Sequence, residues 1–179
     1  FKPYARDPKT LARQWAIPGT PGLEHRVGGL EKDFLTGDIS YDPENHHRMV
    51  QIRAEKIARI VDDIPPAAVE GHSSGKLLVV GWGSTYGAIK SALVEARTRG
   101  HEVSHLHLRY LNPLPKNVGE ILKSFEKVMV PEINNGQLSR ILREHFLVET
   151  IGFNKVRGLP LSSEEVTNAV IAVLGGNNA

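Results

Sequence analysis

The chain has 179 residues, of which 40% are hydrophobic and 23% charged, and its formal net charge is +2. These values are typical of a globular protein with one core, and the absence of a basic cluster argues against nucleic acid as a partner. The sequence contains no cysteine, so this chain cannot form a disulfide, ligate an iron–sulfur cluster or build a thiolate zinc site. No apolar stretch approaches the roughly 20 residues that a membrane helix needs. We therefore expect a cytoplasmic protein that does not contact a membrane.

Residues 1–43 are predicted to form an extended segment. They contain many breakers, including Pro18-Gly19-Thr20-Pro21-Gly22, and show little hydrophobic periodicity. A loop of this length is uncommon inside a compact domain unless it wraps a neighbour or serves a site. Because the chain also starts at Phe1 rather than at a methionine, we expect a piece of a larger protein. Trp15 and Phe34 would then need cover from protein outside this piece.

An amphipathic helix and a linker are predicted over residues 44–75. Apolar side chains recur there at intervals of three and four residues, until Pro65-Pro66 ends the helix. The following residues 67–75 are typical of a linker, with at most a short edge strand near Val69. We place a domain boundary at the end of this linker.

Residues 76–179 alternate strand and helix signals. The apolar run Leu77-Leu78-Val79-Val80-Gly81 is typical of a buried parallel strand, and Ser84 is predicted to cap the helix that follows it. This order predicts a mostly parallel sheet with helices on both faces. The elements expected in chain order after the first strand are a helix over 85–99, a strand over 103–108, a helix over 116–125, a strand over 128–131, a helix over 136–145, a strand over 147–151 or slightly later and a helix from 162.

The turn Gly81-Trp82-Gly83-Ser84-Thr85-Tyr86-Gly87 connects the first strand to a helix, where backbone amides and the helix dipole can hold an anion. Its spacing differs from the dinucleotide fingerprint, because Tyr86 stands where the third glycine belongs and no acidic residue ends the second strand. We favour the interpretation that the glycines permit a tight turn near a neighbouring subunit. Binding of a nucleotide or phosphate is the alternative.

Two histidine pairs are candidate metal ligands. His105 and His107 alternate along one strand and share a face, but no third ligand is evident, so packed histidines are the favoured interpretation. The adjacent pair His46-His47 at a helix start is expected to be solvated. No nucleophile-elbow pattern supports covalent catalysis.

The segment Glu132-Ile133-Asn134-Asn135-Gly136-Gln137-Leu138 follows a strand and opens a helix. This position is the carboxyl edge of the sheet, where ligand sites of open α/β folds gather. Its polar side chains are expected to converge there. From the residues alone, a helix cap is the interpretation that we favour.

Four segments in this order resemble the C-terminal region of the α subunit of thiamine-diphosphate-dependent 2-oxoacid:ferredoxin oxidoreductases, most closely the 2-oxoglutarate type. They are Pro18 to His25, Val80 to Thr85, Leu108 to Pro115 and Val130 to Leu138. The resemblance implies a three-layer α/β/α sandwich over a five-stranded, mostly parallel mixed sheet, like the transketolase C-terminal domain. It would occupy residues 76–179, after the extended segment 1–43 and the helix and linker 44–75.

The resemblance also implies a function for the whole enzyme. The family converts a 2-oxoacid, coenzyme A and oxidised ferredoxin to acyl-CoA, CO2 and reduced ferredoxin, using thiamine diphosphate, magnesium and a [4Fe-4S] cluster. The family's thiamine-diphosphate pattern, G-D-G followed by N-N, is absent, since Gly37-Asp38-Ile39 breaks it. This chain is therefore expected to be an assembly domain that is inactive alone, with no catalytic residue, cofactor or metal of its own.

The expected partners are a preceding pyrimidine-binding domain and the β subunit, in an oligomer that meets ferredoxin and coenzyme A only as a whole. Two turns are predicted to form the contact edges with these partners. Two alternatives are an independent nucleotide- or phosphate-binding protein and a transketolase-like or 2-oxoacid dehydrogenase E1 β domain; the Gly-Trp-Gly-Ser-Thr and Glu-x-Asn-x-Gly-Gln segments argue against the second of these. The predicted contact residues are Gly81, Gly83, Ser84 and Thr85 in the first turn and Glu132, Asn134, Asn135, Gly136 and Gln137 in the second.

Overall fold

The computed structural model describes residues 1–175 and divides into two compact units, one spanning Phe1–Ile64 and the other beginning at Pro65. The second unit thus includes all of residues 67–75, the segment that was predicted to be a linker. None of the described helices combines the length and the apolar character needed to span a membrane.

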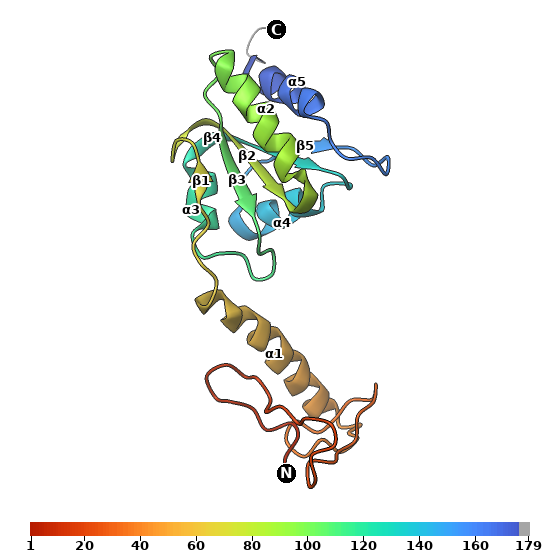
Figure 1. Cartoon of the computed structure of the whole chain (residues 1–179). Helices are drawn as coiled ribbons and strands as arrows, with labels where there is room; N and C mark the ends of the chain where they lie inside the picture. The colour runs from red at the N-terminus through yellow and green to blue at the C-terminus, as the bar shows by residue number, and fades with distance from the viewer. Residues whose placement is uncertain (176–179) are drawn as a thin grey trace. The chain divides into compact units, whose positions relative to one another are not determined.

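The first unit consists of loops followed by helix α1 (Pro43–Arg59) and a 3-10 turn (Ile60–Asp62) (Figure 1). Asp42 caps α1, because its carboxylate accepts hydrogen bonds from the amides of Glu44 and Asn45, each at 3.2 Å. The buried Asn45 ties the loops to the helix by donating to the carbonyl of Lys32 and accepting from the amide of Phe34. These bonds give order to a segment whose residues 1–42 contain two isolated strand bridges and no longer strand.

The second unit is built on one five-stranded sheet with the strand order β1-β3-β2-β4-β5. Strand β1 pairs antiparallel with β3, and the other neighbours pair in parallel. The predicted five-stranded, mostly parallel mixed sheet is therefore confirmed. The strands are β1 (Val69–Glu70), β2 (Gly75–Trp82), β3 (Ser104–Leu108), β4 (Phe125–Glu132) and β5 (Ile151–Asn154).

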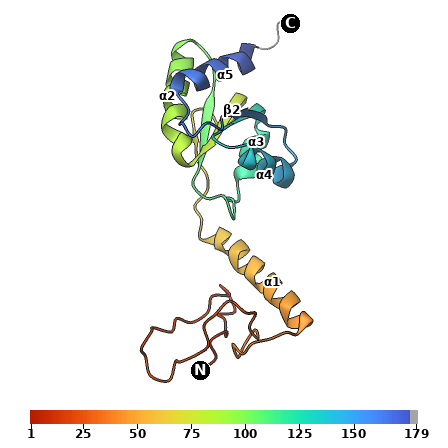
Figure 2. The ribbon, with the colours of Figure 1, turned by 90° about the vertical axis from the view of Figure 1, so that its right-hand side faces the viewer.

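Helices cover both faces of this sheet (Figure 2). Helices α2 (Tyr86–Thr98) and α5 (Ser163–Gly175) pack side by side on one face. Helices α3 (Val118–Lys123) and α4 (Gln137–Phe146) cover the other. The arrangement is the predicted three-layer α/β/α sandwich.

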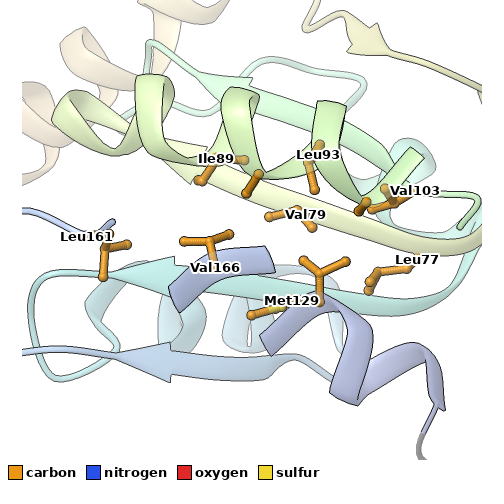
Figure 3. Close-up of a cluster of buried hydrophobic side chains, with 11 residues drawn as sticks. Leu77, Val79, Ile89, Leu93, Val103, Met129, Leu161 and Val166 are labelled. Atoms are coloured by element: carbon orange, nitrogen blue, oxygen red, sulfur yellow. The ribbon is translucent and has the colours of Figure 1, made fainter. Parts of the chain in front are cut away.

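Alternate side chains of the central strand β2 build two separate hydrophobic cores. Leu77 and Val79 pack with residues of α2 and α5 (Figure 3), whereas Leu78 and Val80 pack with residues of α3 and α4. All four side chains are at most 1% exposed. An apolar residue at every position is needed because both faces of this strand are buried.

Several predicted boundaries were wrong. The helix predicted over 116–125 ends at Lys123, and Phe125 already belongs to β4. The last strand lies slightly later than residues 147–151, as the sequence allowed, and begins at Ile151, because Leu147 ends α4 in the left-handed conformation, with φ of 52°. Ser84 does not cap α2, because the N-cap residue is Thr85, which makes no side-chain capping bond to the helix.

Because side chains of β2 are buried on both faces of the sheet, shortening one of these side chains should cost much stability. Leu78→Ala should lower the free energy of unfolding by about 2 to 5 kcal/mol, because it leaves a cavity between the sheet and the α3/α4 layer. Leu159→Ala is the matched control, since that side chain is 60% exposed, and it should change stability by less than about 0.5 kcal/mol. Urea unfolding followed by circular dichroism would measure both. Equal losses would contradict the assignment of this core.

Candidate functional site

The carboxyl edge between β2 and β4 is the place where this type of sheet offers a ligand site. The chain leaves β2 toward β3 on one side and later returns to β4 on the other, and such switch points commonly open a crevice. Both predicted turns begin here, one after β2 and one after β4. They meet through a hydrogen bond of 3.2 Å from the indole Nε1 of Trp82 to Oε1 of Glu132.

The carboxylate of Glu132 is completely buried and accepts four hydrogen bonds. Besides the indole, Oε1 accepts from Nδ2 of Asn134 at 3.1 Å and from the amide of Leu138 at 2.9 Å. Oε2 accepts from the amide of Ser139 at 3.1 Å. A buried carboxylate is costly unless its oxygens are hydrogen-bonded, and these four donors meet that requirement. Glu132 thus caps α4 from the end of the strand before it.

The rest of the turn completes this cap. Oδ1 of Asn134 accepts from the amides of Gly136 and Gln137, at 2.8 and 2.9 Å. Gly136 has a φ of 81°, and a Cβ there would lie 2.9 Å from Nδ2 of Asn154, so a side chain would be strained and crowded. The first amides of α4 therefore bond to side chains of the turn. This arrangement agrees with the helix cap that we favour from the residue types alone.

The turn after β2 is also held by its own side chains. The hydroxyl of Thr85 donates to the carbonyl of Trp82 at 2.8 Å and accepts from the amide of Trp82 at 3.2 Å. A Cβ on Gly81 would overlap Cδ1 of Ile89, so packing of α2 on the strand accounts for this glycine. The close approach of a phosphate is not needed to explain it.

The predicted contact residues differ in what they can reach. Gly81, Thr85, Glu132 and Gly136 are buried and Asn134 is half-buried, so they hold the turns from within. The exposed members can meet another protein, and their role in assembly stays a prediction. These exposed members are Gly83, Ser84, Asn135 and Gln137.

His105 and His107 share one face of β3, as predicted, and pack beneath Tyr86 at the start of α2. The Tyr86 ring stacks on His105 with centroids 5.6 Å apart and meets His107 edge-on at 4.9 Å. Both ring nitrogens of His105 are buried without a hydrogen-bond partner, and its side chain lies 3.9 Å from Oε2 of Glu70. Burial lowers the pKa of His105 to about 4.

This histidine pair is not matched by further ligands. Within residues 1–175, no group of three or more histidine, cysteine, aspartate or glutamate side chains is placed to hold a metal ion. The sequence reasoning identifies Tyr86 only as a departure from a glycine motif and does not predict that its ring stacks on the histidines. One sequence signal for this contact was available. Tyr86 follows β2, the strand that pairs with the histidine-bearing strand β3.

The other histidine pair lies in the first unit and makes separate contacts. Nδ1 of His46 lies 2.6 Å from Oε2 of Glu31, and the other carboxylate oxygen, Oε1, lies 3.0 Å from the guanidinium of Arg53. These two partners hold the pKa of Glu31 below its usual value. His47 contacts Gln51, so the two adjacent rings do not share a ligand.

Comparison with known proteins decides the family. Residues 75–157 match the family model described as pyruvate:ferredoxin oxidoreductase core domain II. The 2-oxoglutarate oxidoreductase subunit KorA of Mycobacterium tuberculosis is 50% identical over 180 residues, which cover all of this chain. The chain belongs to the α-subunit family of 2-oxoacid:ferredoxin oxidoreductases.

Other members of this family support the assignment. Subunit alpha of 2-oxoacid:ferredoxin oxidoreductase 2 from Aeropyrum pernix is 34% identical over 154 residues, or 83% of this chain. The solved 2-oxoglutarate:ferredoxin oxidoreductase from Magnetococcus marinus, which has 2-oxoglutarate, coenzyme A and succinyl-CoA bound, superposes with a TM-score of 0.84 at 30% identity over 97% of this chain. The resemblance inferred from the sequence is therefore confirmed. The chain spans 27%, 24% and 31% of these three relatives, in the order given.

The four bonds to Glu132 predict its importance for the domain. Glu132→Ala should lower the free energy of unfolding by about 3 to 5 kcal/mol, because it leaves buried donors unpaired. Glu132→Gln should cost less, since one acceptor oxygen remains. Chemical denaturation would measure both, with Glu126→Ala as the control because Glu126 is exposed on the same strand. A loss for Glu132→Ala no larger than that of the control would refute the cap.

The buried His105 predicts a loss of stability in acid. Its ordinary pKa is 6.5 and its folded pKa about 4, so between these values the unfolded chain takes up a proton that the folded chain does not. Stability should therefore fall by roughly 2 to 3 kcal/mol as the pH drops from 6.5 to 4. His105→Gln should reduce this dependence, whereas the exposed His145→Gln should not. The same pH slope in wild type and His105→Gln would argue against the assignment.

Proposed function

We propose that this chain is the C-terminal assembly domain of the α subunit of a thiamine-diphosphate-dependent 2-oxoacid:ferredoxin oxidoreductase, with 2-oxoglutarate as the substrate. The intact cytoplasmic enzyme converts the 2-oxoacid, coenzyme A and oxidised ferredoxin to acyl-CoA, CO2 and reduced ferredoxin. This chain supplies packing surface to the β subunit and to a pyrimidine-binding domain. It contributes no reacting group.

The closed carboxyl edge of the sheet is the observation that carries the assembly role. The switch point between β2 and β4 contains the Trp82 indole and the Glu132 carboxylate, joined by a hydrogen bond. Both oxygens of that carboxylate bond to donors of the domain itself. With the usual ligand crevice occupied in this way, the domain is suited to packing rather than to chemistry.

The donor set of the chain does not fit the family's cofactors. A [4Fe-4S] cluster needs cysteine ligands, and the sequence has none. The family's thiamine-diphosphate pattern, which would also hold the magnesium, is absent, since Gly37-Asp38-Ile39 breaks it. We therefore assign thiamine diphosphate, magnesium and the cluster to other parts of the complex.

Exposed apolar side chains in the first unit support a partner surface. Trp15 is 93% exposed, Tyr41 86%, Val27 85% and Ile17 68%. Aromatic side chains are enriched in protein interfaces relative to the rest of the protein surface. The exposed residues of the two turns, Gly83, Ser84, Asn135 and Gln137, are proposed as further contacts.

The choice of 2-oxoglutarate rests on the relatives. The relative with 50% identity over the whole chain and the solved relative with a TM-score of 0.84 both carry this substrate in their names. No residue of this chain is assigned to substrate recognition.

Assembly of the intact α subunit with its β subunit tests the proposal. Trp15→Ser should weaken association by about tenfold or more, because it removes a large aromatic contact, and should lower 2-oxoglutarate-dependent and CoA-dependent ferredoxin reduction in parallel. Val94→Ser is the matched control, since Val94 is 54% exposed on α2. Mass photometry and ferredoxin reduction would report the two quantities. Association and turnover as high in Trp15→Ser as in the control would overturn the proposal.

Titration of this chain alone separates the assembly role from the nucleotide-binding alternative. Thiamine diphosphate with magnesium, coenzyme A and NAD are each expected to give no saturable heat. Micromolar binding of a nucleotide would instead favour the turn from Gly81 to Gly87 as a true site.

A further inference from the structure

A pocket of about 490 Å³ lies in the second unit beside the ends of β1 and β3, apart from the closed edge at Glu132. Its volume is in the range of small-molecule sites, which are mostly apolar with a few placed polar groups. Apolar side chains form much of its wall, and Tyr86 and Tyr110 add aromatic rings. The apolar wall includes Pro65, Pro66, Leu108 and Pro115.

The wall of this pocket is held in place before any ligand arrives. Asn117 fixes the segment that follows the two prolines, because its side chain accepts from the amide of Ala67 at 2.9 Å and donates to the carbonyl of Ala67 at 2.8 Å. Val69 and Glu70 then pair with β3. A preformed pocket spares a ligand the cost of ordering the chain.

The carboxylate in the pocket already has a partner. Oε1 of Glu70 accepts from the hydroxyl of Tyr86 at 3.1 Å, and the same hydroxyl accepts from Nζ of Lys90 at 2.9 Å. Glu70 is therefore engaged with this pair. Because Glu70 is still negatively charged, its carboxylate disfavours a ligand that would place a second negative group near it.

Arg109 lines the pocket, and its guanidinium is available to bind a ligand. The residue directly follows β3 and is exposed, and its side chain makes no hydrogen bond or ion pair with another residue of the described range 1–175. Burial, and then the nearby Arg109 charge, lower the pKa of His107, which keeps this neighbouring ring neutral at neutral pH. A guanidinium at the mouth of an apolar pocket is suited to a bidentate bond with a carboxylate.

We propose that this pocket binds a monocarboxylate with a planar aromatic body. The carboxylate binds Arg109, and the ring system lies against Tyr110 and the proline wall. The single negative charge follows from the one available guanidinium and the opposing Glu70. This site is independent of the assembly role proposed above.

The test compares three ligands of one shape and different charge on this chain. The probe is 2-naphthylacetate, with 2-naphthylacetamide as the neutral counterpart and 2-naphthylethylamine as the cation. Ligand-observed NMR titration should give a Kd of about 1 mM or tighter for the carboxylate, the affinity expected of a ligand of this size. The amide and the amine should bind at least tenfold more weakly.

Two matched variants locate the binding. Arg109→Gln should weaken 2-naphthylacetate binding by about tenfold or more, whereas Arg157→Gln should leave it unchanged, because Arg157 is exposed outside the pocket. Both substitutions lie at exposed positions, and circular dichroism would verify folding. Absence of saturable binding, equal binding of acid and amide, or unchanged binding to Arg109→Gln would each overturn the proposal.

Discussion

The second unit depends on one buried carboxylate being fully hydrogen-bonded. Glu132 ends the strand β4 with no exposed surface, so its charge is tolerated only if donors surround it. Those donors come from β2, from the turn and from the start of α4. The same contacts fix where the strand ends, where the helix begins and what fills the space between the two central strands. The side chain of Glu132 thus fixes the geometry of the carboxyl edge between β2 and β4. This closed edge leaves the domain suited to packing against other proteins.

The sheet and its layers could be predicted because their signals are local. An uninterrupted apolar run such as Leu77 to Val80 indicates a strand buried on both faces, and the helices between the strands require parallel pairing. Boundaries were harder. Phe125 satisfies either a helix end or a strand start, and its contact with the core decides for the strand. Ser84 matched a capping pattern, but Thr85, one residue later, makes the hydroxyl bonds at this turn.

The site was predicted only in outline, because its decisive contacts are distant in sequence. The helix cap in the turn after β4 could be inferred from the asparagine and glycine types. The bond from Trp82 spans 50 residues, and no local pattern shows that an indole would reach Glu132. The pocket beside Arg109 has the same origin, since it joins the prolines before β1 to the end of β3 through the fold. The family could be recognised because four short motifs occur in the order typical of it. This order is more specific for the family than any single motif.

The two tryptophans of the chain lie one in each unit and in opposite surroundings. Trp15 is almost fully in water, while the Trp82 indole is partly buried and hydrogen-bonded to a carboxylate. Their fluorescence should therefore separate into a red-shifted emission that iodide quenches readily and a second emission that is more protected. A chain with either tryptophan replaced by phenylalanine would carry an intrinsic optical label for one unit. Events at the loops could then be followed independently of events in the α/β core, without attaching a dye.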